Sequence, residues 1–157
     1  MEPGKRGGAL AYALKVLTRG RKTRCEVEGK LLEKGYPRSA VEGALADLER
    51  WGYIDDSSFC RAWLEERLRQ KPMGRRRLAL ELLMRGVNET VVKESLSRYY
   101  PADEYELALD AARKRISVLK MGGKGPLTDR DRRRLAAFLE RRGFETWVIA
   151  RVLEEVF

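Results

Sequence analysis

Apolar residues in this chain recur every three or four positions, the spacing that places them on one face of an α-helix. In the segment 105–119, Tyr105, Leu109, Ala112, Ile116 and Leu119 form one such stripe. No segment alternates apolar and polar residues with β-branched enrichment, as a half-buried strand would. The pattern predicts an all-α protein, with helices near residues 8–19, 23–34, 38–51, 56–70, 75–85, 89–99, 102–121, 129–142 and 145–156.

Three glycines, Gly35, Gly86 and Gly143, anchor an internal repeat. Each follows a basic residue, precedes an apolar one and has a leucine four positions before it. Three further columns, eight positions before and six and ten positions after each glycine, are apolar in every copy: Val27, Leu78, Leu135; Val41, Val92, Ile149; Leu45, Leu96, Leu153. Glycine just past a helix end adopts a left-handed conformation at little cost. Each copy therefore predicts a helix, a glycine turn and a second helix.

The repeats suggest a domain organisation. We expect a flexible N-terminus at residues 1–8, an N-terminal helix with repeat 1 at 9–72, repeat 2 at 73–121 and an incomplete repeat 3 at 128–157. The segment 122–127 is glycine-rich and contains a proline, so it predicts a linker. One hairpin cannot bury its apolar face alone, and neighbouring copies together with the additional helices must complete the core.

Composition and charge limit the classes of function that this chain can have. Lys plus Arg is 33 against 24 for Asp plus Glu, a net charge of +9, which favours an anionic partner such as nucleic acid. The chain has no histidine and two distant cysteines, which excludes Ser-His-Asp and Cys-His catalysis, the commonest zinc sites and a disulfide framework. Without a long apolar run or a secretory signal, we expect a cytoplasmic protein that needs no membrane and no cofactor.

Four short runs carry a family resemblance: 31–36, 52–56 followed by Phe59, 81–87 and 141–144. In order and spacing they resemble the RecX family, bacterial regulators of the RecA recombinase, from about Ala9 to Phe157. The resemblance implies tandem three-helix, helix-turn-helix-like repeats in an elongated, curved array. It also implies a non-enzymatic protein that binds RecA and the RecA–DNA filament. Such a protein inhibits ATP hydrolysis, strand exchange and co-protease activity in recombination, DNA repair and the SOS response.

Basic residues gather in two stretches. Residues 67–85 include seven basic residues and one acidic residue, and residues 113–134 include nine basic residues and two acidic residues. Solvated helices usually mix both signs. Arg24, Arg75 and Arg132 share one position in the three copies, in the first turn of a helix, where a base opposes the helix dipole by about 0.3–1 kcal/mol. Free N–H groups beside such arginines would suit a phosphate.

We therefore expect thirteen basic residues to contact either DNA phosphate or an acidic surface of RecA. Binding to DNA would show only a weak sequence preference, and the protein is expected to be a monomer. The thirteen residues are Arg24, Arg67, Arg69, Lys71, Arg75, Arg76, Arg77, Arg113, Lys114, Arg130, Arg132, Arg133 and Arg134. The competing interpretation is that the arginines reflect genome composition and solubility. The bases before each glycine, Lys34, Arg85 and Arg142, suit a helix C-terminus and are interpreted as structural.

The remaining motifs are interpreted as structural. Asp55 and Asp56 predict a cap on the next helix, although a carboxylate pair can also hold a metal. Thr23 and Thr128 begin capping boxes. Most aromatic residues are expected in the core, with Trp51 and Trp147 undecided and the pair at 99–100 half exposed.

Two other classes of function compete with this one. A sequence-specific helix-turn-helix repressor would recognise the edges of DNA base pairs with Arg, Asn or Gln side chains on the second helix of a hairpin. The segments 39–50 and 89–98 contain few such residues and several acidic ones. An enzyme acting on nucleic acid would need histidine, a glycine-rich phosphate loop or clustered carboxylates. We expect no catalytic, cofactor-binding or metal site.

Overall fold

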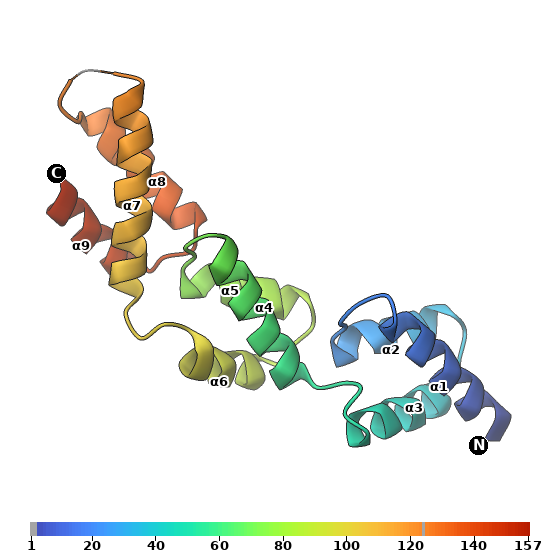
Figure 1. The fold of residues 1–157 in the computed structure, drawn as a ribbon. Helices are drawn as coiled ribbons and strands as arrows, with labels where there is room; N and C mark the ends of the chain where they lie inside the picture. The colour runs from blue at the N-terminus through green and yellow to red at the C-terminus, as the bar shows by residue number, and fades with distance from the viewer. Residues whose placement is uncertain (1–2, 124) are drawn as a thin grey trace. The chain divides into compact units, whose positions relative to one another are not determined.

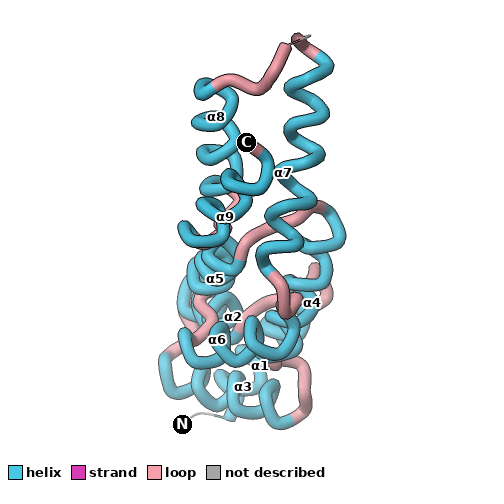
Figure 2. The backbone as a smooth tube through the Cα atoms, turned by 90° about the vertical axis from the view of Figure 1, so that its left-hand side faces the viewer, coloured by secondary structure: helices cyan, strands magenta, loops and turns pink. Residues whose placement is uncertain are grey.

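The computed structural model describes residues 3–123 and 125–157, which form nine α-helices and no strand, as predicted (Figures 1 and 2). The helices are α1 (Pro3–Leu17), α2 (Arg24–Glu33), α3 (Arg38–Arg50), α4 (Asp56–Gln70), α5 (Arg75–Met84), α6 (Glu89–Tyr99), α7 (Glu104–Met121), α8 (Asp129–Arg141) and α9 (Thr146–Val156). Residues 1–2 of the expected N-terminal segment and Lys124 of the expected linker lie outside the described residues. Among the described helices, none combines the length and apolar character needed to cross a bilayer.

The first helix begins at Pro3, well before the predicted start near residue 8. A tertiary contact accounts for the difference. The Arg6 guanidinium donates to both carboxylate oxygens of Asp47, at 2.7–3.1 Å, and Asp47 is buried in α3. This contact spans 41 residues of sequence and leaves no mark on the local hydrophobic pattern.

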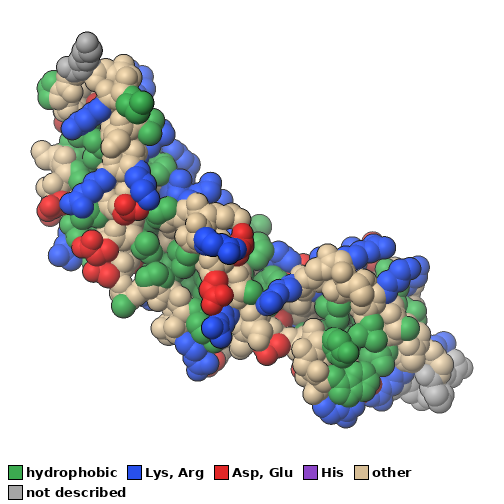
Figure 3. Space-filling view, viewed as in Figure 1, with side chains coloured by type: hydrophobic (Ala, Val, Ile, Leu, Met, Phe, Trp, Pro, Cys, Tyr) green, Lys and Arg blue, Asp and Glu red, His purple; other side chains and the backbone are tan. Residues whose placement is uncertain are grey.

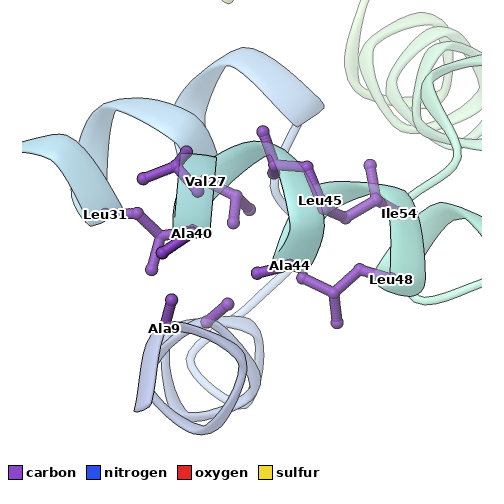
Figure 4. Close-up of a cluster of buried hydrophobic side chains, with 10 residues drawn as sticks. Ala9, Val27, Leu31, Ala40, Ala44, Leu45, Leu48 and Ile54 are labelled. Atoms are coloured by element: carbon purple, nitrogen blue, oxygen red, sulfur yellow. The ribbon is translucent and has the colours of Figure 1, made fainter. Parts of the chain in front are cut away.

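The chain divides into two compact units. Unit 1 comprises residues 1–62 and 82–95, and α1, α2 and α3 pack on one another within it (Figure 1). Alanines on α1 and α3, among them Ala9, Ala40 and Ala44, let these helices approach closely, and Leu31 of α2 and Leu45 of α3 belong to the same buried cluster (Figure 4). The buried faces are those of the repeat columns.

The glycine turns follow the predicted geometry. Gly35, Gly86 and Gly143 have φ of +98°, +81° and +84°. The residue after each glycine donates its N–H to the carbonyl five positions back, at 3.2–3.3 Å, which closes the helix end as a Schellman motif. The three predicted helix–turn–helix hairpins are therefore confirmed.

Unit 2 comprises residues 63–81 and 96–157, and here α7 packs against both α8 and α9. Ala108 and Ala112 of α7 share a cluster with Leu135, Leu139 and Phe144 of the third hairpin. The repeat pattern groups this helix with repeat 2 and leaves repeat 3 incomplete. In the structure α7 precedes and covers the third hairpin, as α1 precedes and covers the first. A hydrophobic stripe shows that a helix has a buried face, but not which neighbour covers it.

Candidate nucleic-acid interface

The thirteen predicted bases are not all in one unit. Arg24 lies in unit 1, and the other twelve lie in unit 2, on α4, α5, α7 and α8 or directly after the end of α4. Arg24, Arg67 and Arg75 are half-buried, and the other ten are exposed. Figure 3 shows Lys and Arg side chains on both units, with acidic side chains among them.

Three of these bases are held by acids within their own unit. Arg24 forms ion pairs with Glu49 and, at 3.3 Å, with Glu28. Arg67 and Arg77 share Glu81, at 2.7 and 3.3 Å. Burial opposes ionisation of Glu81, but hydrogen bonds, first from Arg67, lower the pKa of its carboxyl. Of the three, Arg67 has the most buried pair, with side chains 24% and 17% exposed.

At the start of α2, acceptors occupy the N–H groups of Arg24 and Glu26. Arg24 donates its backbone N–H to Asp56 at 2.9 Å, and Glu26 donates to the Thr23 hydroxyl at 3.2 Å within the predicted capping box. Asp56 therefore caps α2 as well as opening α4, and burial raises the pKa of its carboxyl. Asp55 caps α4 itself by accepting from the Ser58 N–H at 3.2 Å. The structural interpretation of the aspartate pair is confirmed.

The start of α5 repeats this arrangement. Arg75 donates its N–H to Glu104 at 2.9 Å, and Arg76 donates to the carbonyl of Gly143 at 3.2 Å. Gly74 also donates its N–H, to the carbonyl of Arg142 at 2.8 Å. The backbone N–H groups of Arg24, Arg75 and Arg76 are therefore not free for a phosphate, because acids and a carbonyl from later in the chain already accept them.

The start of α8 differs from the other two. Thr128 and Asp131 form the predicted capping box, and hydrogen bonds from Thr128 and then the charges of nearby arginines lower the pKa of Asp131. Relative to its glycine, α8 begins three residues earlier than α2 and α5 do. The four basic residues near its start, Arg130, Arg132, Arg133 and Arg134, are all exposed. Arg132 stacks on Phe157, 5.7 Å from the ring centre.

Several bases have no acidic side chain within salt-bridge distance among the described residues: Lys71, Arg76, Arg113, Arg130, Arg133 and Arg134. Arg69 and Lys114 pair with Glu66 and Asp110 on exposed helix faces. Such surface pairs contribute about 0–1 kcal/mol and exchange readily for another anion. These eight basic residues, together with the exposed Arg132, remain available to a partner.

Sequence reasoning missed two arginines. Arg115 was outside the predicted set, and Arg142 was interpreted as a complement to a helix dipole. Both guanidinium groups lie over the ring of Phe138, at 5.4 and 4.8 Å from its centre. Burial and then the positive charges of Arg77 and Arg115 lower the pKa of Arg142. No sequence pattern could show that side chains on α7 and at the end of α8 meet.

The aromatic residues follow the prediction of core packing only in part, because most of them are half-buried or exposed. Phe59 and Phe144 are buried, whereas Trp51 and Trp147 are 53% and 61% exposed. Tyr100 departs from the prediction of half exposure: it is buried and donates its hydroxyl to the carbonyl of Met73 at 2.7 Å. Burial raises the pKa of Tyr100, and the Arg75 guanidinium lies 4.7 Å from its ring centre.

The chain is similar in sequence to one family of known proteins. Residues 9–48 match the family model "RecX, first three-helix domain" and residues 55–96 match "RecX, second three-helix domain". A "Regulatory protein RecX" from Pelodictyon phaeoclathratiforme is 37% identical over 139 residues, which cover 88% of this chain and 82% of the relative. One from Thermobifida fusca is 32% identical over 147 residues, 94% and 77% of the two chains.

A solved structure is similar along the whole chain. The crystal structure of RecX from Lactobacillus salivarius has a TM-score of 0.84, at 18% identity, and covers 99% of this chain and 98% of that one. This likeness concerns the fold. The two family models match the first two three-helix modules, and the identity to relatives extends over most of the chain. This chain belongs to the RecX family of regulatory proteins.

Proposed function

We propose that this protein is a non-enzymatic inhibitor of RecA that binds the RecA–DNA filament and suppresses its ATPase, strand-exchange and co-protease activities. The observation that carries the proposal is membership of the RecX family, with identity to "Regulatory protein RecX" relatives over most of the chain. The protein would act in the cytoplasm, as a monomer and without a cofactor.

The arrangement of modules supports binding to a polymer. Three hairpins of one design are joined in a single chain, and exposed bases without acid partners recur on α5, α7 and α8 among the described residues. Weak contacts on linked modules combine through effective concentration, so that several modest sites give firm binding. A protein held across neighbouring RecA subunits would hinder the subunit motions that ATP hydrolysis and strand exchange need.

The competing repressor function has less support. The second helix of a hairpin would have to read base edges. On α3 the exposed positions include Glu42 and Glu49, and on α6 they include Glu89 and Glu94. Acids on these faces would repel the phosphate backbone during docking.

The test is the ATPase of RecA on single-stranded DNA, measured against increasing concentrations of this protein, with co-sedimentation of the filament in parallel. The wild type is expected to inhibit. Replacing Arg76, Arg133 and Arg134 by Glu should weaken inhibition at least tenfold, whereas replacing Lys30, Lys93 and Arg98, which are also exposed, should change it little. A wild-type protein that neither sediments with the filament nor slows ATP hydrolysis would refute the proposal.

A further inference from the structure

A groove in unit 2 carries positive charge that no acid in its described lining balances. Its volume is about 330 Å³, and the described residues that line it include the four bases Lys71, Lys114, Arg115 and Arg142 and no Asp or Glu. Phe138 and Pro72 contribute apolar surface to it. The groove lies between the end of α4, the middle of α7 and the end of α8, all within unit 2.

Two of the bases are fixed in place. Arg142 donates from Nη1 to the carbonyl of Pro72 at 2.9 Å, and the guanidiniums of Arg142 and Arg115 both lie over the Phe138 ring. Guanidiniums that are stacked and hydrogen-bonded lose little further side-chain entropy when an anion binds. They are also half-buried, so their field at the groove is less screened than that of a base in open solvent.

Helix ends explain only part of this charge. Lys71 follows the C-terminus of α4, and Arg142 caps the C-terminus of α8, where the dipole favours a cation. Lys114 and Arg115 lie inside α7, far from either of its ends. Lys114 forms an exposed pair with Asp110 at 2.8 Å, whereas Arg115 stacks on Phe138. The dipoles therefore do not account for the two bases that α7 contributes.

We infer that this groove binds a backbone phosphate of nucleic acid, with Arg115 and Arg142 as the inner contacts and Lys71 and Lys114 as the outer ones. Arginine side chains suit the phosphate geometry through paired N–H donors. The outer lysines are exposed, so the groove is open, as a chain that continues on both sides requires. A small free anion would be held better by an enclosed site. The inference deepens the proposed function, on which it rests for its biological setting.

The test measures binding of a fluorescent single-stranded oligonucleotide and of the matching duplex, in the absence of RecA and over a series of salt concentrations. The groove variant is Lys71→Gln with Arg115→Gln, which leaves the Arg142 hydrogen bond intact. The matched control is Lys93→Gln with Arg98→Gln, which removes the same charge from exposed positions on α6. Thermal unfolding by circular dichroism checks each fold.

The groove variant should bind roughly tenfold more weakly than wild type. The slope of log affinity against log salt should fall by about 0.7 for each single-strand phosphate that the variant no longer neutralises. The control variant on α6 should change both the affinity and the salt slope by less than the groove variant does. If the double variant proves unstable, the single change Lys71→Gln at an exposed side chain should still lower the slope.

Equal affinity and slope in the groove variant and the control would overturn the inference, as would a wild-type protein that binds neither oligonucleotide. Weaker filament binding with oligonucleotide binding unchanged would also overturn it, because the groove would then face protein. These outcomes are separate from failure of the proposed function, in which the wild type leaves the RecA ATPase unaffected.

Discussion

The starts of α5 and α8 both carry clustered arginines, but only the start of α5 is covered by other parts of the chain. At α5 the turn at Gly143 and the carboxylate of Glu104 occupy the backbone N–H groups, and Arg77 is paired with Glu81. At α8 the local capping box satisfies the backbone, and the arginines that follow are exposed. A cluster of arginines at a helix start thus lies at a contact between hairpins in α5, whereas in α8 it lies on an exposed surface.

The largest effect is expected at the glycine that forms this contact. In Gly143→Ala the new Cβ would lie 2.3 Å from the Arg77 Cβ, and the backbone would keep its positive φ. Together, close packing and backbone strain should lower the free energy of unfolding by about 3 kcal/mol, measured by urea denaturation. Gly35→Ala is the matched control: it has the same backbone strain and nothing within 4 Å, so about 1 kcal/mol is expected. Equal losses would show that the contact is not tight.

Removing the acid at the covered helix start comes next. Glu104→Ala leaves the N–H of Arg75 without its acceptor and should cost about 1–2 kcal/mol of unfolding free energy. Asp129→Ala, in the exposed first turn of α8, should cost no more than about 0.5 kcal/mol. Chemical denaturation of both variants under one buffer makes the comparison. A larger loss for Asp129→Ala would contradict the distinction between the two starts.

The arginines themselves should separate stability from binding. Arg77→Ala removes a hydrogen bond to the Arg141 carbonyl at 2.9 Å and an ion pair, and should cost about 1 kcal/mol of stability. Arg133→Ala should leave stability within about 0.5 kcal/mol of wild type. Co-sedimentation with RecA filaments should show the greater loss of binding for Arg133→Ala. The reverse order in either measurement would break the comparison.

The smallest effect is a pH dependence. Burial, and next the charge of Glu145, raise the pKa of Glu104, while Arg75 opposes the rise. The folded state therefore holds this proton more tightly than the unfolded state, and stability falls as pH rises above the ordinary carboxyl value. Glu104→Gln keeps an oxygen acceptor but does not titrate. Wild type should lose stability relative to this variant as pH rises above 4.5, the ordinary value of the carboxyl, measured by thermal unfolding. A constant difference would contradict the assignment.

The local architecture could be predicted because its causes are local. A glycine with positive φ and apolar columns at helical spacing suffice to define a hairpin, and all three hairpins are present. The start of α1 and the partner of α7 were not predicted. The first depends on Arg6 and Asp47, far apart in sequence, and the second depends on which hairpin α7 covers.

The candidate site was predicted less completely, for the same physical reason. Sequence identified stretches of unbalanced charge, and the exposed bases of α7 and α8 lie within them. It could not separate Arg67, which is paired with Glu81, from Arg76, because pairing depends on how helices pack. It also gave no sign that Arg115 and Arg142 share one aromatic ring.

The early start of α8 has a consequence for engineering. The first two hairpins begin at a point where a later glycine turn fits against them, and the third carries an additional helical turn at that point. Grafting a fourth copy behind the third would therefore require trimming residues 128–130 and supplying an acid like Asp56 or Glu104. Without those few positions, another glycine turn could fit against α8 as the turn at Gly143 fits against α5.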